Sequence, residues 1–287
     1  MGYEVAVTPR GPYSLALSAR LSSDATRRLR DGIFTACLEV DGRAELAAAS
    51  QAPDGTVWIR AQSEAGASRL RWVLALDDDH APFLAAVRDD HLLGRTARLL
   101  RGLRPVRVPT VALALLRAFC GQLVESRTAR ELERRIVRAT TTRGPLGLSV
   151  PPTQADLGRL SAAELRRLGL HARRGAALVR ICRSLELERL HAAPTAAVAA
   201  RLERERGLGP WSAGLVLMEG LGRPERGLVG DLGLIKLVAE LEGRHVEAED
   251  TAALLARYGE WGGLASVYLL AGFARGLVPG APSRAAA

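Results

Sequence analysis

The chain has 287 residues, of which 48% are hydrophobic and 25% are charged, and its formal net charge is +9. This apolar fraction excludes a disordered chain, and 3 cysteines are too few for a disulfide scaffold. No apolar run reaches about 18 residues and residues 1–5 lack a signal-peptide pattern, so we expect no membrane partner and a cytoplasmic location.

The first 90 residues show the alternation of polar and apolar residues that is typical of half-buried strands. Asp41-Gly42 is a strong hairpin signal, Pro53-Asp54-Gly55 is a second turn, and a helical pattern follows over 65–75. We therefore expect a small antiparallel sheet with helices on one face over residues 1–90. The predicted strands cover 13–21, 32–40, 44–51 and 56–62.

Strand signals are absent after residue 90, and helical periodicity takes their place. One long amphipathic pattern covers 109–138, a loop rich in Gly, Pro and Thr covers 140–152, and Ser161-x-x-Glu164 is a capping box. The fold class is therefore α+β, with an all-helical domain over 91–278 and a frayed tail at 279–287. Further helices are predicted from 153 and over 174–187, 194–205, 210–220, 232–241, 249–257 and 263–273.

The excess of positive charge favours a polyanionic partner such as nucleic acid. All of the 40 basic residues except Lys236 are arginine. A GC-rich genome imposes the same enrichment in arginine and alanine on any protein, so charge alone leaves both interpretations open.

The most informative segment is a hairpin at 202–222, whose turn and second helix start read Gly207-Leu-Gly-Pro-Trp-Ser-Ala-Gly214. Gly207 and Gly209 permit a close approach of the backbone, and Pro210 suits the first turn of a helix. Free N–H groups at such a turn suit a bound phosphate. An ordinary turn between two helices explains the same residues.

A second segment, from Arg223 to Asp231, is a Gly/Pro-rich loop that ends in an aspartate at a predicted helix start. The order of hairpin, helix, loop and aspartate resembles the helix-hairpin-helix DNA glycosylases, and within them the 3-methyladenine DNA glycosylase II type. Residues 117–124, 152–178 and 258–265 also follow the pattern of that type. For the N-terminal sheet domain, the resemblance implies a fold like that of TATA-binding protein.

The resemblance implies that Asp231 is the catalytic residue. Cleavage of an N-glycosidic bond builds positive charge on the deoxyribose, which a carboxylate stabilises, and the carboxylate can also orient or deprotonate the attacking water. Asp231 equally suits the N-cap of the next helix. Trp211 stands where bifunctional relatives carry their Schiff-base lysine, and Lys236, the only side-chain amine, is expected to be structural or to contact a phosphate.

A flipped base needs a pocket, and aromatic walls suit an electron-poor alkylated base. The resemblance places five residues there: Trp211, Trp261, Gln122, Leu215 and Leu232. The two leucines stand where relatives often have tyrosine, so we expect a more aliphatic pocket. Each tryptophan also fits a place in the core.

Leu123 aligns with the apolar wedge that fills the duplex after the base leaves, although a leucine at this spacing also fits the buried face of a helix. Phosphate contacts are expected from the hairpin residues Gly207, Gly209, Trp211, Ser212 and Gly214. The family also implies a monovalent cation on hairpin carbonyls, here those of Glu203, Glu205 and Leu208, where the approach to the hairpin is unusually charged.

The cysteines and histidines show no spacing typical of an iron–sulfur cluster or a zinc site, so we expect no other cofactor. The sequence and the resemblance together predict a monomeric, monofunctional DNA glycosylase of the bacterial nucleoid. It would release alkylated (3-methyladenine-like) or deaminated purines from damaged double-stranded DNA in base excision repair. The alternative is a non-catalytic helix-hairpin-helix protein that binds DNA or lesions.

Overall fold

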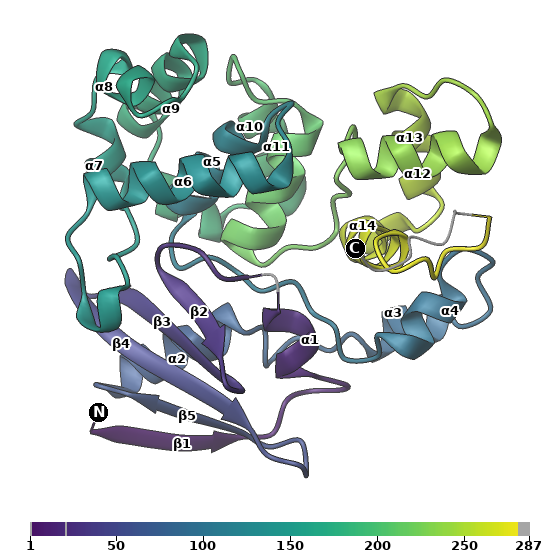
Figure 1. Cartoon of the computed structure of the whole chain (residues 1–287), viewed down its shortest axis with the longest axis horizontal. Coiled ribbons are helices and arrows are strands. Elements are labelled where there is room, and N and C mark those ends of the chain that lie inside the picture. Colours follow the sequence, from purple (N-terminus) through teal and green to yellow (C-terminus); the bar gives the residue numbers. More distant parts are fainter. Residues whose placement is uncertain (1, 21, 281–287) are drawn as a thin grey trace.

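The N-terminal part of the chain is an antiparallel sheet with one long helix on its face (Figure 1). The structure is a computed structural model that describes residues 2–20 and 22–280. The strand order is β1-β5-β4-β3-β2, and all neighbouring pairs are antiparallel. The strands are β1 (Tyr3–Val7), β2 (Arg27–Arg30), β3 (Ile33–Val40), β4 (Arg43–Gln51) and β5 (Val57–Ala61).

Helix α2 (Glu64–Val73) covers the apolar face of this sheet. The side chain of Ser63 caps the helix by accepting a hydrogen bond from Gly66 N–H. Between β3 and β4, Asp41 and Gly42 both have positive φ angles, of 49° and 78°, as a two-residue type I′ turn requires. The predicted strands at 32–40, 44–51 and 56–62, their hairpin and the helix at 65–75 are thus confirmed within a few residues.

The predicted strand at 13–21 is wrong, because this segment contains helix α1 (Leu15–Ala19). Ser14 caps it by accepting a hydrogen bond from Leu17 N–H, and Leu15, Ser18 and Ala19 turn toward the interior at helical spacing. Strands β1 and β2 were not predicted. β2 consists of three arginines and a leucine, and its pairing with β3, rather than its own pattern, makes it a strand.

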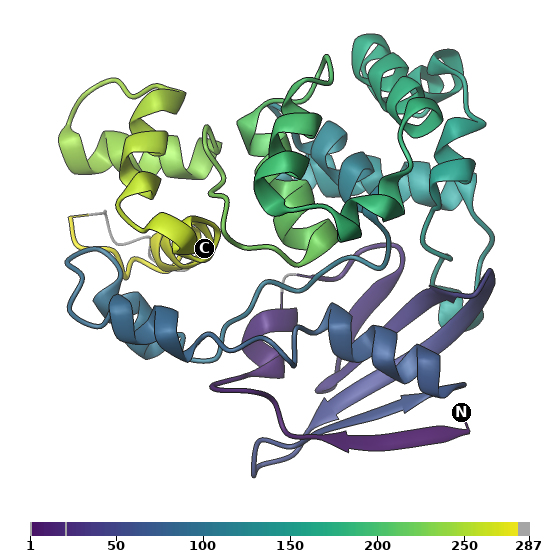
Figure 2. The same ribbon diagram turned by 180° about the vertical axis from the view of Figure 1, so that it is seen from behind.

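The remaining helices form two lobes above the sheet domain, as Figures 1 and 2 show from opposite sides. One lobe contains α5–α11, and the other contains α12–α14 together with α3 and α4. The helices are α3 (Ala81–Ala86), α4 (Gly94–Leu99), α5 (Val111–Gly121), α6 (Ser126–Thr140), α7 (Gln154–Gly158), α8 (Ala162–Arg167), α9 (Ala172–Ser184), α10 (Thr195–Glu203), α11 (Pro210–Leu215), α12 (Leu232–Glu242), α13 (Ala248–Ala256) and α14 (Gly262–Phe273). Shorter turns lie at η1 (Pro145–Gly147), η2 (Leu187–Ala192), η3 (Val216–Gly220) and η4 (Gly259–Trp261).

The predicted helices of this half are confirmed, with one correction. The single pattern over 109–138 is broken into α5 and α6, because Gln122 is extended and Leu123 has a φ of +52°. Thr153 and Ser161 both form the reciprocal hydrogen bonds of a capping box. The helix α11 continues into η3, a short stretch of π-helix.

The α+β fold class is confirmed. The domain boundary at residue 90 and the likeness of the sheet domain to TATA-binding protein stay predictions, although Phe83 and Val87 already pack in the helical core. The last part of the expected tail, 281–287, lies outside the described residues. No helix within the described ranges is long and apolar enough to cross a membrane.

Arg117 on α5 joins three segments that are distant in the sequence. Its guanidinium donates hydrogen bonds to Glu133 on α6 (2.8 and 2.9 Å), Glu219 on η3 (2.5 Å) and Asp24 of the sheet domain (2.7 Å). Burial would raise the pKa of Asp24, but the guanidiniums of Arg27 and Arg117 hold it below its ordinary value. Burial would likewise lower the pKa of Arg117, but the three carboxylates raise it well above the ordinary value.

Replacement of Arg117 by alanine should lower the free energy of unfolding by about 3–5 kcal/mol, because it leaves three carboxylates without their shared cation. Urea denaturation measures this change. The matched control is Arg127→Ala on α6, whose exposed ion pair with Glu131 should contribute less than about 1 kcal/mol. An equal loss of unfolding free energy in both variants would show that the ion pairs of Arg117 contribute no more than an ordinary surface ion pair.

Candidate active site

The turn between α10 and α11 depends on Gly207, which has a φ of +102°. A β-carbon at this position would lie 3.2 Å from Ala177 Cβ and 3.5 Å from Phe119 Cε1. Leu208 N–H donates to the carbonyl of Glu205 at 3.0 Å and closes the turn. The predicted hairpin is therefore present, and a bulkier residue at Gly207 would collide with the core beneath it.

The start of α11 leaves backbone donors available. Gly209 is the N-cap and supplies no side-chain cap, Pro210 has no N–H, and the N–H groups of Trp211 and Ser212 belong to the first helical turn, which has no partner inside the helix. A β-carbon at Gly209 would meet nothing within 4 Å, so the approach to these donors is open. This geometry suits the phosphate contact predicted for the hairpin.

Gly214 has a different place from the other hairpin residues. It lies inside α11, and a β-carbon there would lie 2.6 Å from the carbonyl oxygen of Gly227. The N–H of a residue in this position points along the helix to the preceding turn. Gly214 therefore lets the Gly/Pro-rich loop pack against α11, and the predicted phosphate contact does not fit its position.

Asp231 is the last residue of that loop and the N-cap of α12. The sequence allowed for this capping role. Its Oδ1 accepts hydrogen bonds from Gly233 N–H (2.8 Å) and Leu234 N–H (3.4 Å). Its Oδ2 accepts a hydrogen bond from the indole Nε1–H of Trp211 at 2.9 Å. The fold thus brings together the hairpin and the aspartate, the two motifs that carried the resemblance.

The end of α5 lies against this hairpin. A β-carbon at Gly121 would lie 2.7 Å from Cη2 of Trp211, so the indole reaches the helix end. The side-chain amide of Gln122 donates to Gly207 O (2.7 Å) and to Ser212 Oγ (3.1 Å). The structure therefore gives Gln122 a structural contact with the hairpin, where the sequence predicted a pocket residue.

Leu123 projects into solvent. It follows α5, has a left-handed backbone with φ +52°, and is 83% exposed. This excludes the alternative of a buried helix leucine. An exposed apolar side chain beside the hairpin is the arrangement that a duplex-filling wedge requires.

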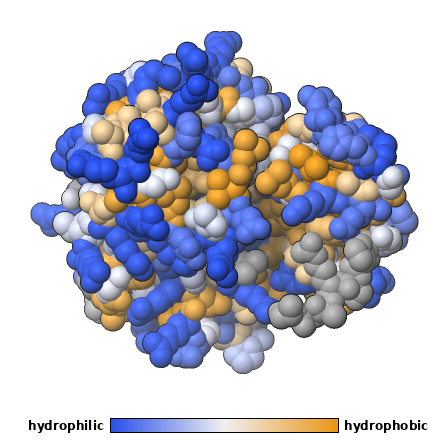
Figure 3. Space-filling model, turned by 45° about the horizontal axis from the view of Figure 1, so that its top comes forward, coloured by the Kyte–Doolittle hydropathy of each residue, from blue (hydrophilic) through white to orange (hydrophobic). Residues whose placement is uncertain are grey.

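The other predicted pocket residues are only partly brought together. Leu232, at the start of α12, is 44% exposed next to Asp231, whereas Leu215 is buried in the core and does not fit the predicted pocket. Trp261 is half-buried and packs against Phe83, with ring centroids 6.1 Å apart. Figure 3 shows hydrophobic side chains on both sides of the hollow between the two helical lobes.

The residues whose carbonyls were predicted to hold a cation lie at the end of α10 and in the turn that follows. The carbonyl of Glu205 already accepts the N–H of Leu208 inside the turn. The side chains of Glu203 and Glu205 pair with Arg226 and Arg201, each at 2.7 Å. Within the described residues, no three His, Cys, Asp or Glu side chains are grouped to hold a metal. A cation on these carbonyls stays a prediction.

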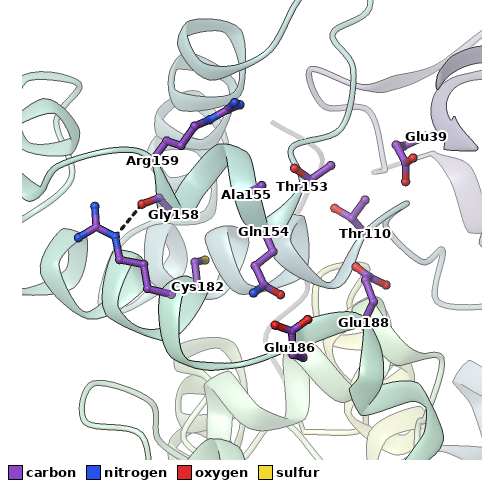
Figure 4. Close-up of a pocket in the computed structure, with 11 residues that line it drawn as sticks. Glu39, Thr110, Thr153, Gln154, Ala155, Gly158, Arg159, Cys182, Glu186 and Glu188 are labelled. Carbon is purple, nitrogen blue, oxygen red and sulfur yellow. Dashed lines mark hydrogen bonds between the residues drawn. The ribbon is translucent and has the colours of Figure 1, made fainter. Parts of the chain in front are cut away.

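A separate cavity of about 500 Å³ lies beside α7, α9 and η2, and none of the predicted site residues line it (Figure 4). Its polar groups hold backbone together: Gln154 accepts Leu187 N–H at 2.7 Å, and Glu188 accepts Val111 N–H at 2.9 Å. Burial would raise the pKa of Glu188, but His191 and the N–H of Val111 keep it below its ordinary value. The polar side chains that line the cavity therefore have a structural role: they hold the starts of η2 and α5 in place.

No protein-family model matches the chain. A DNA-3-methyladenine glycosylase of Bacillus subtilis is 27% identical over 205 residues, which cover 68% of this chain and 67% of that protein. A 3-methyladenine DNA-glycosylase structure from Archaeoglobus fulgidus has a TM-score of 0.82 and 21% identity, and covers 93% of this chain and 97% of its own. The chain is thus similar in sequence to one DNA-3-methyladenine glycosylase and shares its fold with solved structures of DNA glycosylases.

Proteins with different chemistry share the fold of this chain. An 8-oxoguanine glycosylase/lyase structure from Clostridium acetobutylicum has a TM-score of 0.76 at 15% identity, over 94% of this chain and 96% of that one. The fold alone therefore does not separate a hydrolase from a lyase, and the difference must lie in the side chains around Asp231.

Replacement of Gly214 by alanine should lower the free energy of unfolding by about 1–3 kcal/mol, because the new β-carbon meets a backbone carbonyl that no side-chain rotation can move. Thermal or urea denaturation measures it. In the control Gly158→Ala, the new atom has ordinary contacts of 3.7 Å, and the stability should change little. A Gly214→Ala variant as stable as the wild type would refute the close packing of loop and helix.

Proposed function

We propose that this chain is a monofunctional DNA glycosylase that hydrolyses the N-glycosidic bond of alkylated or deaminated purines in double-stranded DNA. The observation that carries the proposal is the Asp231 carboxylate, held between the Trp211 indole and the start of α12, in the same site as the exposed Leu123. The name of the Bacillus subtilis relative supports 3-methyladenine as the type of base. We further propose that the protein acts as a monomer in the cytoplasm.

In this mechanism the damaged nucleotide leaves the stack and Leu123 occupies its place in the duplex. The N–H groups of Trp211 and Ser212 hold a backbone phosphate and so fix the register of the DNA. As the bond between C1′ and the base nitrogen breaks, the bonding electrons leave with the base and positive charge develops on the sugar. The Asp231 carboxylate stabilises that charge, and a water molecule adds its oxygen to C1′ and loses its proton to the carboxylate or the base.

The absence of an amine at the hairpin supports hydrolysis by water. A lyase needs an amine nucleophile that forms a Schiff base with the sugar. The hairpin carries Trp211 at the relevant position, and the single lysine, Lys236, is an exposed residue of α12 five positions beyond Asp231. The side chains next to the carboxylate, Trp211 and Leu232, are apolar or aromatic and favour a flat, electron-poor base.

Replacement of Asp231 by asparagine should leave binding to lesion-containing duplex intact and lower base release at least 100-fold, because the charge that stabilises the sugar cation is lost. Free base released from alkylated DNA and from hypoxanthine-containing duplex measures this, with strand scission appearing only after alkali. Asp89→Asn, at an exposed position, is the matched control. Full hydrolysis by the asparagine variant would refute the mechanism, and tight lesion binding without release by the wild type would favour the non-catalytic alternative.

Replacement of Leu123 by alanine should weaken binding to a lesion or abasic duplex by about 10-fold, whereas binding to undamaged duplex, which depends on phosphates and salt, should change little. Fluorescence anisotropy at two salt concentrations measures both. Leu99→Ala on α4, which removes a leucine that is 55% exposed, is the control. Equal loss on both DNAs would mean that Leu123 contributes to general contact rather than to insertion.

A further inference from the structure

Trp211 contacts the carboxylate with its only polar atom. The sequence predicted this residue as an aromatic wall and a phosphate-binding backbone position, but neither role involves the indole N–H. That N–H donates to Oδ2 of Asp231 at 2.9 Å. We propose that Trp211 is a positioning residue that fixes the Asp231 carboxylate for attack on the sugar, and that Gly121 is the residue that allows it to do so. This proposal rests on the proposed glycosylase function.

The two oxygens of Asp231 have separate donors. Oδ1 accepts the N–H groups of Gly233 and Leu234 at the start of α12, and Oδ2 accepts the indole N–H. A donor on each oxygen stops rotation of the carboxylate about its bond to Cβ. Each carboxylate oxygen has two lone pairs, so Oδ2 can still face a water molecule or the sugar. The indole thus fixes the orientation of the group without blocking it.

The indole is held at its opposite edge by the end of α5. A β-carbon at Gly121 would lie 2.7 Å from Cη2 and 3.6 Å from Cζ2 and Cζ3 of Trp211. The indole is rigid, so a push at Cη2 would move Nε1 away from Asp231. The lack of a side chain at Gly121 therefore sets the position of the indole N–H, which a flexible donor could not maintain as well.

The hairpin that carries Trp211 is fixed to the same helix end. Gln122, next to Gly121, donates to Gly207 O and Ser212 Oγ, on either side of Trp211 in the sequence. Three consecutive residues therefore contact the indole, hold the hairpin backbone and project the wedge into solvent. The carboxylate and the wedge share one support, which keeps the reacting group in register with the DNA.

The test uses Trp211→Phe, which keeps a ring but removes the donor, and Gly121→Ala, which keeps the donor but displaces it. Each should lower the single-turnover rate of base release by about 10- to 100-fold, the effect of one charge-assisted hydrogen bond. Affinity for an abasic-analogue duplex should change less than about 2-fold. Trp58→Phe, an exposed tryptophan of β5, is the matched control.

A double-mutant cycle separates positioning from general disturbance. Phenylalanine lacks Cη2, the atom that a β-carbon at Gly121 would meet, so Gly121→Ala should have little further effect in the Trp211→Phe background. Additive losses would mean that Gly121 acts through something other than the indole. Equal loss of affinity and rate in Trp211→Phe would mean that the ring is a pocket wall, and would overturn the positioning role.

A spectroscopic readout tests the contact without any activity. The 4 tryptophans give four indole N–H signals in a ¹H–¹⁵N spectrum, and Trp211→Phe assigns the relevant one. That signal should move in Asp231→Asn and in Gly121→Ala but not in Trp58→Phe. If the Trp211 indole signal does not move in Asp231→Asn, the positioning role is overturned even if the enzyme is active. A wild type that releases no base while the signal responds would instead overturn the proposed function.

Discussion

The candidate site depends on the placement of α5, and the partly buried charge of Arg117 fixes that helix. One guanidinium on α5 is shared by carboxylates from the sheet domain, α6 and η3. Removing one partner of such a group leaves the others charged and poorly hydrated, which strongly destabilises the fold. The same helix ends one turn later at Gly121, Gln122 and Leu123. A charge network that joins the two domains therefore also determines where the wedge and the hairpin support lie.

Close backbone approaches bring the remaining parts of the site together. The loop that ends in Asp231 packs between α11, where Gly214 faces the Gly227 carbonyl, and α14, where Gly263 faces the carbonyl of Pro224. A side chain at either glycine would push the loop outward and Asp231 with it. Within the loop, a β-carbon at Gly227 would lie 2.6 Å from Leu255 Cδ1 and 3.3 Å from the carbonyl oxygen of Gly262, so close packing explains this glycine better than flexibility does.

The sequence predicted the elements with strong periodicity and the order of the motifs, but it could not predict contacts between them. β3, β4, β5 and most of the helices follow from local patterns, whereas alternation at 13–21 was overridden by the Ser14 cap and by burial of Leu15 and Ala19. The resemblance identified Asp231 and the hairpin. The break after Gly121, the Arg117 network and the bond from Trp211 to Asp231 depend on residues about 20 to 100 positions apart, which no local pattern contains.

Leu123 shows why a site residue can oppose stability. A leucine in the left-handed region costs on the order of 1–3 kcal/mol, and its exposure of 83% forgoes the gain from burial. The backbone accepts this conformation because Gln122 is tied to the hairpin on one side and α6 begins three residues later on the other. Folding alone would favour turning this side chain inward. A strained, exposed apolar residue whose neighbour Gln122 is bonded to the hairpin is better explained by a partner that supplies the missing apolar contact, and the interior of a base stack is such a surface.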